Sequence, residues 1–317
     1  MARELKDLTP AEVKSLNREK TLFLFATSPL TDLGDHLSSG VRLESSTALA
    51  RQVAQTLEKR GLECIFMPAL SLGVSSANTQ FSVLVRPHVL RDAIVDQCES
   101  LHRLGFRWFI CFSSEHSPQQ LVTLEEAGKF LANRTSGWKS WTGRWVNRLP
   151  GVSATHASLM SADSALIDRK ELWRAPMWPD PLEIGGAQDT SRALAVSAQS
   201  VRPFYKDQIP ISVSTSRWER FWSWWSRESL GYTGDPSQAD ASMGEKSLSS
   251  ESDLIVAKVL AVLDGSPAPV VFRSGFSLFP TNSSVFWVWI MSLVLFVLFL
   301  TWLVWALQWL TQGLQID

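Results

Sequence analysis

Three short stretches decide the fold: TLFLFAT at Thr21–Thr27, ECIFM at Glu63–Met67 and RWFICF at Arg107–Phe112. Each is a nearly continuous apolar run of strand length, which is typical of strands that are buried on both faces. Helical patterns separate the runs from one another. Alternation of buried strands with helices predicts a mostly parallel sheet that is covered by helices on both faces.

The segments between these strands carry helical signals. A helix that Ser45 or Ser46 can cap ends at Gly61, a second helix runs from His88 to Leu104, and Pro118 opens a third. In a parallel sheet connected in this way, ligands bind beyond the carboxyl ends of the strands. We therefore expect the functional residues to follow the three apolar runs.

A long apolar run lies near the C-terminus. Residues Val285–Leu310 read VFWVWIMSLVLFVLFLTWLVWALQWL and carry no charge. A run of about 20 apolar residues spans the hydrocarbon core of a bilayer, whereas a core helix of this length normally keeps a charged face. The run is therefore predicted to be a transmembrane helix. Tryptophans near its two ends are predicted to contact the membrane interfaces or a partner, and they are Trp287, Trp289, Trp302, Trp305 and Trp309.

These patterns divide the chain into four parts. We expect an α/β domain over residues 1–264, a proline-containing linker over 265–284, the membrane span over 285–310 and a short tail over 311–317. The charged N-terminal segment lacks the apolar core of a signal peptide. The expected topology is therefore a tail-anchored, single-pass membrane protein with its N-terminal domain in the cytoplasm.

Charge and cysteine content narrow the functional class. The formal net charge of -1 argues against a nucleic acid partner. Cys64, Cys98 and Cys111 are an odd number, and two of them lie inside the apolar runs. This pattern predicts reduced thiols in a core rather than a disulfide framework. The sequence contains no CxxC pair, no HExxH motif and no glycine-rich phosphate loop.

Four segments of the chain resemble, in the same order, the motifs of a known family. GDHLSSGVRLESSTALARQVAQTLEKRG from Gly34 is similar to the family's HGPHLPLGTDT stretch and the helix after it. LHRLGFRWFICFSSEHS from Leu101 resembles the GFR–strand–NGHGGN element, and HASLMSADSALI from His156 resembles HAGExETS. GYTGDPSQADASMG from Gly231 is similar to the GDPxxAxxxxG turn. In this order the segments resemble the creatininase (creatinine amidohydrolase) family. The resemblance implies a three-layer α/β/α sandwich with a mostly parallel central sheet, and a two-metal hydrolase that acts on a cyclic amide.

The metal-ligand positions that the resemblance implies are largely changed. Glu115 falls on the histidine of NGHGGN, and His156 is retained. A two-metal site needs several oxygen or nitrogen donors, so we expect no catalytic residue, no metal and no other cofactor in a degenerate member of the family. Where the family has Glu, His, Asp, an occasional carboxylate and two glutamates, this chain has in order Thr31, Leu33, Arg42, Ser117, Leu159 and Ser161.

Polar groups near the implied cleft leave an alternative open. A surviving metal-dependent amidohydrolase acting on a C–N bond would use His36, Glu115, His116 and His156. Zn or Mn would then be held by Glu115, His156 and Asp163. None of these residues has ligand spacing of its own. The competing interpretation is a set of loop polar groups that cap helices and pair with a nearby arginine.

Two tryptophan-rich clusters lie outside the predicted span. The first has Trp138, Trp141 and Trp145 at helical spacing, where core packing and a surface role stay equally open. The second lies within WERFWSWW, which begins at Trp218, and is predicted to contact the membrane or a partner. Its residues are Trp218, Phe221, Trp222 and Trp225.

Three functions fit these observations. We favour a membrane-anchored, catalytically inactive creatininase-like protein that serves as an accessory or assembly subunit of a membrane complex. Its expected partners are membrane lipid and another membrane protein, and the family's habit of forming rings makes a homo-oligomer a further expectation. The alternatives are a metal-dependent amidohydrolase with a rearranged site, and a small-molecule-binding sensor with Arg42 as an anion anchor.

Overall fold

The computed structural model describes residues 3–74, 81–135, 157–166, 184–211, 231–274, 276 and 285–313, without the side chains of 133–135, 285–290 and 309–313. The chain divides into two compact units, Met1–Thr281 and Asn282–Asp317.

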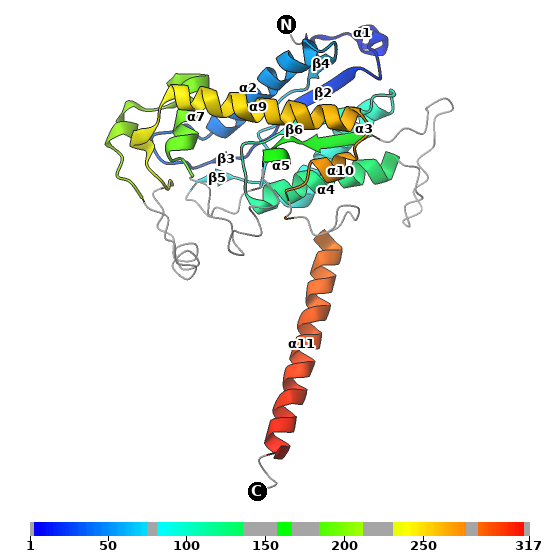
Figure 1. Ribbon diagram of the computed structural model, residues 1–317, viewed down its shortest axis with the longest axis vertical. Helices are drawn as coiled ribbons and strands as arrows, with labels where there is room; N and C mark the ends of the chain where they lie inside the picture. The colour runs from blue at the N-terminus through cyan, green and yellow to red at the C-terminus, as the bar shows by residue number, and fades with distance from the viewer. Residues whose placement is uncertain are drawn as a thin grey trace. The chain divides into compact units, whose positions relative to one another are not determined.

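A five-stranded sheet forms the centre of the first unit (Figure 1). Its strand order is β1-β4-β2-β6-β7, and every pairing is parallel. The three apolar runs of the sequence become β2, β4 and β6, as predicted. A separate antiparallel pair joins β3 (Leu30–Thr31) to β5 (Ser82–Val83). The strands of the main sheet are β1 (Arg3–Glu4), β2 (Thr21–Ala26), β4 (Glu63–Phe66), β6 (Trp108–Phe112) and β7 (Ser158–Ser161).

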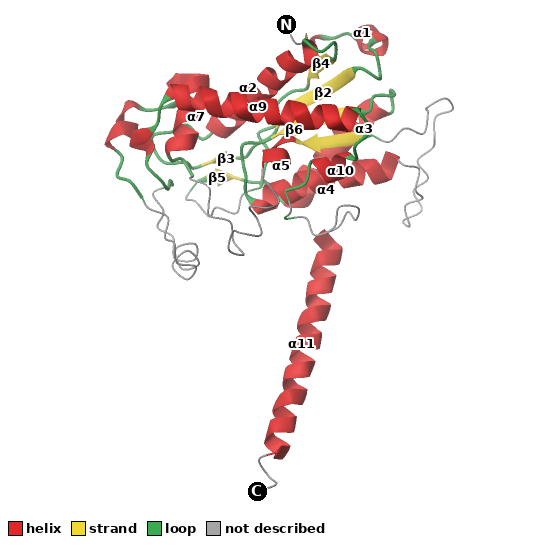
Figure 2. Ribbon diagram, in the orientation of Figure 1, coloured by secondary structure: helices red, strands yellow, loops and turns green. Residues whose placement is uncertain are grey.

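Alternating side chains of β2 separate two cores. Phe23 and Phe25 belong to one core, whereas Leu22 and Leu24 belong to the core on the opposite face. Each fully buried side chain of this size stabilises the fold by about 1.5–3 kcal/mol. Helices cover both faces (Figure 2), which confirms the predicted three-layer α/β/α sandwich. The helices are α3 (Pro87–His102) and α4 (Pro118–Thr135) on the phenylalanine face, and α2 (Val41–Glu58) and α9 (Ala241–Leu263) on the leucine face.

Shorter elements complete the first unit. Thr9 and Glu12 form a capping box at the start of α1, which satisfies backbone donors at that helix end. The remaining helices are α1 (Pro10–Ser15), α5 (Ala162–Leu166), α7 (Ala187–Ser197) and α10 (Ala268–Val271), with 3-10 turns η1 (Leu5–Asp7), η2 (Ala198–Ser200), η3 (Pro203–Asp207) and η4 (Pro236–Gln238).

The start of α2 differs from the prediction. The helix begins at Val41 with Gly40 as its cap, so Ser45 and Ser46 lie inside it. Ser46 Oγ donates to Arg42 O at 2.6 Å instead of capping the helix end. A serine hydroxyl is equally satisfied by the carbonyl of the preceding turn, and this is why the sequence signal was misleading. The predicted ends of the other helices are close to those observed, and α4 does begin at Pro118.

The three cysteines are buried and form no disulfide. Cys98 and Cys111 lie in the core on the phenylalanine face, and Cys64 lies in the core on the leucine face. Burial raises the pKa of the Cys64 thiol to about 12, so the thiolate is not available at neutral pH. The prediction of core thiols is confirmed.

The chain after α9 packs back on the domain. Ala268 and Phe272 are buried in the core on the leucine face. Ser274 then donates from its backbone nitrogen at 2.8 Å and from its hydroxyl at 2.5 Å to Glu125 Oε1. The first ten residues of the predicted linker are therefore a structured part of the first unit.

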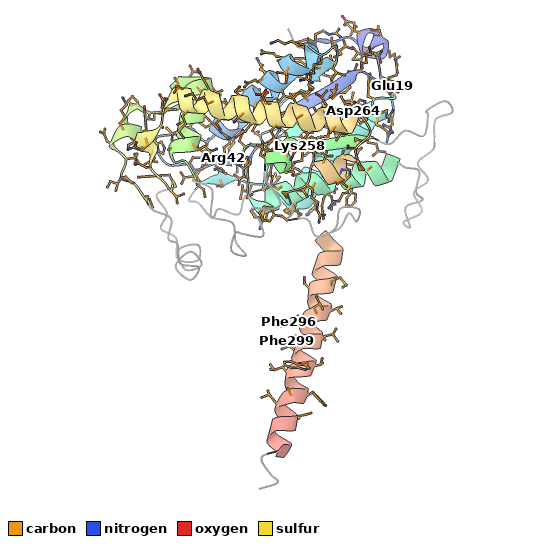
Figure 3. All side chains as sticks on the ribbon, in the orientation of Figure 1. Glu19, Arg42, Lys258, Asp264, Phe296 and Phe299 are labelled. Atoms are coloured by element: carbon orange, nitrogen blue, oxygen red, sulfur yellow. The ribbon has the colours of Figure 1, made fainter. Side chains whose placement is uncertain are left out.

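The second unit contains α11 (Val285–Gly313). Within the described residues, this helix is long and apolar enough to cross a membrane. Thr301 Oγ1 donates to Leu298 O at 2.8 Å, so its hydroxyl is satisfied within the helix. Phe296 and Phe299, labelled in Figure 3, are exposed on α11, and so are Trp302 and Trp305. The side chains of Trp287, Trp289 and Trp309 lie outside the described residues.

Candidate functional site

The candidate site lies where β2 and β6 end. The chain runs from β2 outward to β4, then crosses back to pair β6 on the other side of β2. This reversal of strand order is the switch point at which parallel sheets of this kind bind ligands. The loops after β2 and β6, the first turn of α2 and the start of α5 supply buried polar side chains there, including Arg42 (Figure 3).

Arg42 is the central charge of this site. Its guanidinium is buried and pairs with Glu115, in the loop after β6, through Nη1. Its Nη2 donates to Asp189 Oδ2 at 2.9 Å, and the Gly185 N–H donates to the same oxygen at 2.9 Å. Burial would raise the pKa of Asp189, but the charge of Arg42 and these two hydrogen bonds outweigh it, so the net shift is downward. A buried cation between two carboxylates thus occupies this part of the site.

The serines after β6 hold the loop in place. Ser46 Oγ accepts from Ser114 N at 2.8 Å and donates to Arg42 O. Ser113 Oγ accepts from Gln120 Nε2 at 3.1 Å and from Glu115 N at 3.2 Å. The serine hydroxyls therefore stabilise the loop after β6 and hold in place the backbone that carries Glu115.

His116 and Asp163 form a second pair. His116 Nε2 lies 3.3 Å from Asp163 Oδ1, and Asp163 Oδ2 accepts from Ser113 N at 2.5 Å. Burial raises the pKa of Asp163, and His116 and the backbone hydrogen bonds act in the opposite direction. This pair joins β7's end to the loop after β6.

His36 lies in a third, separate environment. Its Nε2 is 2.9 Å from Gly185 O and 3.2 Å from Thr190 Oγ1. Since a carbonyl only accepts, Nε2 carries the hydrogen, and Nδ1 has no hydrogen-bond partner within the described residues. Burial lowers the pKa of His36, against the hydrogen bond to Gly185. The ring of Tyr232 packs edge-on at 5.4 Å between centroids.

The candidate metal residues therefore have different partners. Glu115 pairs with Arg42, Asp163 with His116, and His36 with Gly185. The part of the chain that the structure describes contains no group of three His, Cys, Asp or Glu side chains that could hold a metal ion. His156 lies outside the described residues.

The positions that the family resemblance assigns to metal ligands do not fit the metal pair. Thr31 is buried in β3, and Leu33 packs in a small apolar cluster with Leu37 and Val41. Neither side chain supplies the carboxylate or imidazole that a divalent ion needs. At the third position, Arg42 supplies a positive charge, which repels a cation. Ser117, Leu159 and Ser161 replace the remaining carboxylates.

Sequence reasoning missed two residues of this region. Asp189 was not singled out, although it follows a Gly-Gly pair and lies in the first turn of α7. Arg192, one turn later, is also buried and donates to Ser247 at 3.0 Å and pairs with Glu251 of α9. The predicted contact residues Trp218, Phe221, Trp222 and Trp225 lie outside the described residues, as do Trp138, Trp141 and Trp145.

Fold and site together define an α/β/α sandwich protein whose polar site follows the strands of a parallel sheet. The family profile for creatininase, described as creatinine amidohydrolase, matches residues 6–259 of the chain. The chain therefore belongs to the creatininase family, which confirms the resemblance seen in the sequence.

Solved structures agree on the fold. A tryptophan-to-alanine mutant creatininase superposes with a TM-score of 0.60 at 17% identity, covering 83% of this chain and 99% of that chain. A creatinine amidohydrolase (creatininase) gives 0.57 at 16% identity, covering 84% and 99%. The putative creatinine amidohydrolase of Bacteroides fragilis gives 0.56 at 15% identity, covering 83% and 95%. No curated protein matches the chain.

Proposed function

We propose that this chain is a membrane-anchored member of the creatininase family that has lost catalysis and serves as an accessory or assembly subunit of a membrane complex. One observation carries the proposal: a buried arginine, paired with Glu115 and Asp189, stands at a position that the family resemblance assigns to a metal ligand.

The guanidinium is an electrostatic substitute for a metal ion. A cation between two carboxylates offsets their negative charge and holds together the loops that carry them, which is the structural part of what a metal does in such a cleft. A guanidinium has no open coordination position and cannot lower the pKa of a bound water as a Lewis acid does. The fold is thereby preserved while the hydrolytic chemistry of the family is lost.

The apolar helix α11 supports the membrane part of the proposal. Its length and lack of charge suit a bilayer span, and the tryptophans near its ends suit the two interfaces. In this proposal the N-terminal domain lies in the cytoplasm, and the anchor keeps it beside membrane proteins with which it assembles.

The two alternatives are less well supported by the contacts. A rearranged amidohydrolase needs Glu115 and Asp163 as ligands, yet both already have partners. A sensor that captures an anion with Arg42 would have to displace two carboxylates from it. Both carboxylates are held by further hydrogen bonds from backbone nitrogens, those of Ser117 and Gly185.

Elemental analysis of the full-length chain tests the loss of catalysis. The chain is purified in detergent without chelator, incubated with Zn²⁺ or Mn²⁺, and passed through gel filtration. We expect less than one metal ion per chain after incubation with either Zn²⁺ or Mn²⁺. One or more metal ions per folded chain would overturn the proposal, and an amidohydrolase screen with Glu115→Gln would then follow.

Two further measurements test the membrane role. The full-length chain should stay with membranes after alkaline carbonate extraction, and another membrane protein should co-purify with it in mild detergent. Release by carbonate would refute the anchor. A chain that is anchored but purifies alone at every detergent concentration tested would refute the accessory role.

A further inference from the structure

Exposed apolar side chains gather on two stretches of the first unit. Within the described residues, 81–88 and 202–210 hold most of its exposed large hydrophobic side chains, with Ile209 75% exposed and Phe81 53% exposed. Soluble surfaces normally scatter such residues singly, so a local concentration of them marks an interaction site. The members are Phe81, Val83, Leu84, Phe204 and Ile209, and we refer to them as the rim surface.

Hydrogen bonds attach both stretches to the loop that follows β2. Phe81 O accepts from Asp32 N at 2.8 Å, and the β3–β5 pair aligns Thr31 with Ser82. The second stretch begins where Arg202 N donates to His36 O at 2.8 Å. Since residues 31–36 are one short piece of chain, the two stretches lie at the same end of the sheet.

A second set of contacts brings Ile209 to the same loop. Tyr232 Oη donates to Ile209 O at 2.8 Å. The neighbouring Gly231 packs so closely on Asp32 that a β carbon there would lie 2.2 Å from Asp32 Oδ1. The rim surface therefore lies beside the loop that forms one side of the candidate site.

The charges beside the rim surface indicate which kind of partner it binds. Arg86, Arg202 and Lys206 are exposed beside its apolar side chains, and they outnumber the exposed acids nearby, which are Asp207 in these two stretches and Asp35 in the loop that they contact. Apolar side chains mixed with arginine and lysine are typical of segments that lie in the interface of an anionic bilayer. Each such cation is attracted to the negative surface potential of an anionic leaflet.

We propose that the rim surface rests on an anionic lipid interface, with its apolar side chains inserted among the headgroups. This inference rests on the proposed anchor, because α11 would hold the domain at the bilayer and raise the local concentration of lipid around the rim surface. Anchor and rim surface together would orient the domain on the membrane instead of leaving it free to rotate.

Site-specific labelling of the full-length chain tests this proposal. Its own cysteines are buried, so Val83→Cys or Ile209→Cys gives one reactive thiol in the folded protein. An environment-sensitive dye is attached there, and the chain is reconstituted into phosphatidylcholine vesicles with or without phosphatidylserine. Ser249→Cys, at an exposed position of α9, is the matched control.

We expect doxyl-labelled lipid to quench the dye at positions 83 and 209 several-fold more than the dye at position 249. The quenching should be stronger with phosphatidylserine, weaken with salt, and decrease in the double variant Arg86→Glu, Lys206→Glu. Equal quenching at all three positions in a chain that floats with the vesicles would overturn the inference and leave the anchor intact. A chain that does not float would overturn both. A dye at position 83 or 209 that lipid does not quench, and whose emission changes only when another membrane protein is reconstituted with the chain, would assign the surface to a protein partner. That result would refute the lipid assignment.

Discussion

Arg42 Nη2 donates to Asp189 Oδ2 at 2.9 Å, although 147 positions separate the two residues in the chain. The same guanidinium pairs with Glu115. One side chain from the first turn of α2 therefore fastens the first turn of α7 and the loop after β6 at the centre of the candidate site.

Replacement of Arg42 should be severely destabilising. Arg42→Ala leaves the buried Glu115 and the partly buried Asp189 without their cation, and breaking a buried pair in this way costs about 3–5 kcal/mol. The free energy of unfolding can be measured from the denaturant dependence of labelling of the buried cysteines. The matched control is Arg51→Ala on the same helix, whose exposed guanidinium lies 3.6 Å from Glu4. That variant should lose no more than about 1 kcal/mol. Equal losses in the two variants would contradict the importance of the buried pair.

Alanine substitutions at two glycines with positive φ allow the cost of backbone strain to be measured apart from the cost of steric overlap. Gly61 has φ of +81° and open space around it, so Gly61→Ala should cost about 1–2 kcal/mol from the left-handed conformation alone. Gly185 has φ of +65°, and a β carbon there would lie 2.0 Å from Leu33 O. Gly185→Ala should therefore cost a further 1–3 kcal/mol or so, because backbone atoms must move. The thiol-labelling assay measures both, and equal costs would be inconsistent with this close approach.

The stability of the chain should depend on pH through His36. Burial lowers the pKa of His36 below the ordinary value of 6.5, so the unfolded chain takes up this proton more readily than the folded chain. The contribution of neutral His36 to the free energy of unfolding is therefore fully present above pH 6.5, and it is lost as the pH falls below 6.5. His36→Gln should flatten the free energy of unfolding between about pH 5 and 7. An unchanged slope in the variant would show that other groups dominate this range.

The three thiols should not react with a maleimide while the protein is folded. Burial raises the pKa of Cys64 to about 12 and also raises the pKa values of Cys98 and Cys111. A maleimide at pH 8 should thus add to no cysteine of the native chain and to all three after denaturation, as counted by mass spectrometry. Rapid labelling of any one of them under native conditions would mean that its packing opens readily.

The sequence predicted the sheet well because its central strands need apolar residues on both faces. Leu22, Phe23, Leu24 and Phe25 form an unbroken apolar run in β2, and such a pattern does not fit an exposed element. The start of α2 was wrong because Ser45 and Ser46 satisfy a capping rule that the structure does not use. Local signals of that kind compete with tertiary contacts, here the hydrogen bonds of Ser46 with Arg42 and Ser114.

The candidate site was less predictable than the sheet. Arg42 and Glu115 were identified because the family resemblance fixes their positions. Asp189 belongs to no motif, and its role depends on the fold that brings α7 against α2. Its available signal was an acid in the first helical turn after Gly185 and Gly186, which is common at helix starts and therefore weak. The separate partners of His36 and Asp163 could be found only from coordinates.

The Arg42 cluster also bears on how the chain can evolve. A neutral residue in place of Arg42 leaves the carboxylates of Glu115 and Asp189 without their cation, and an acidic residue there would place three carboxylates together. Loss of either carboxylate alone leaves an arginine charge that is only partly compensated. A substitution that removes one charge of this cluster therefore lowers stability, so we expect the three residues to change together, or not at all, as the protein evolves.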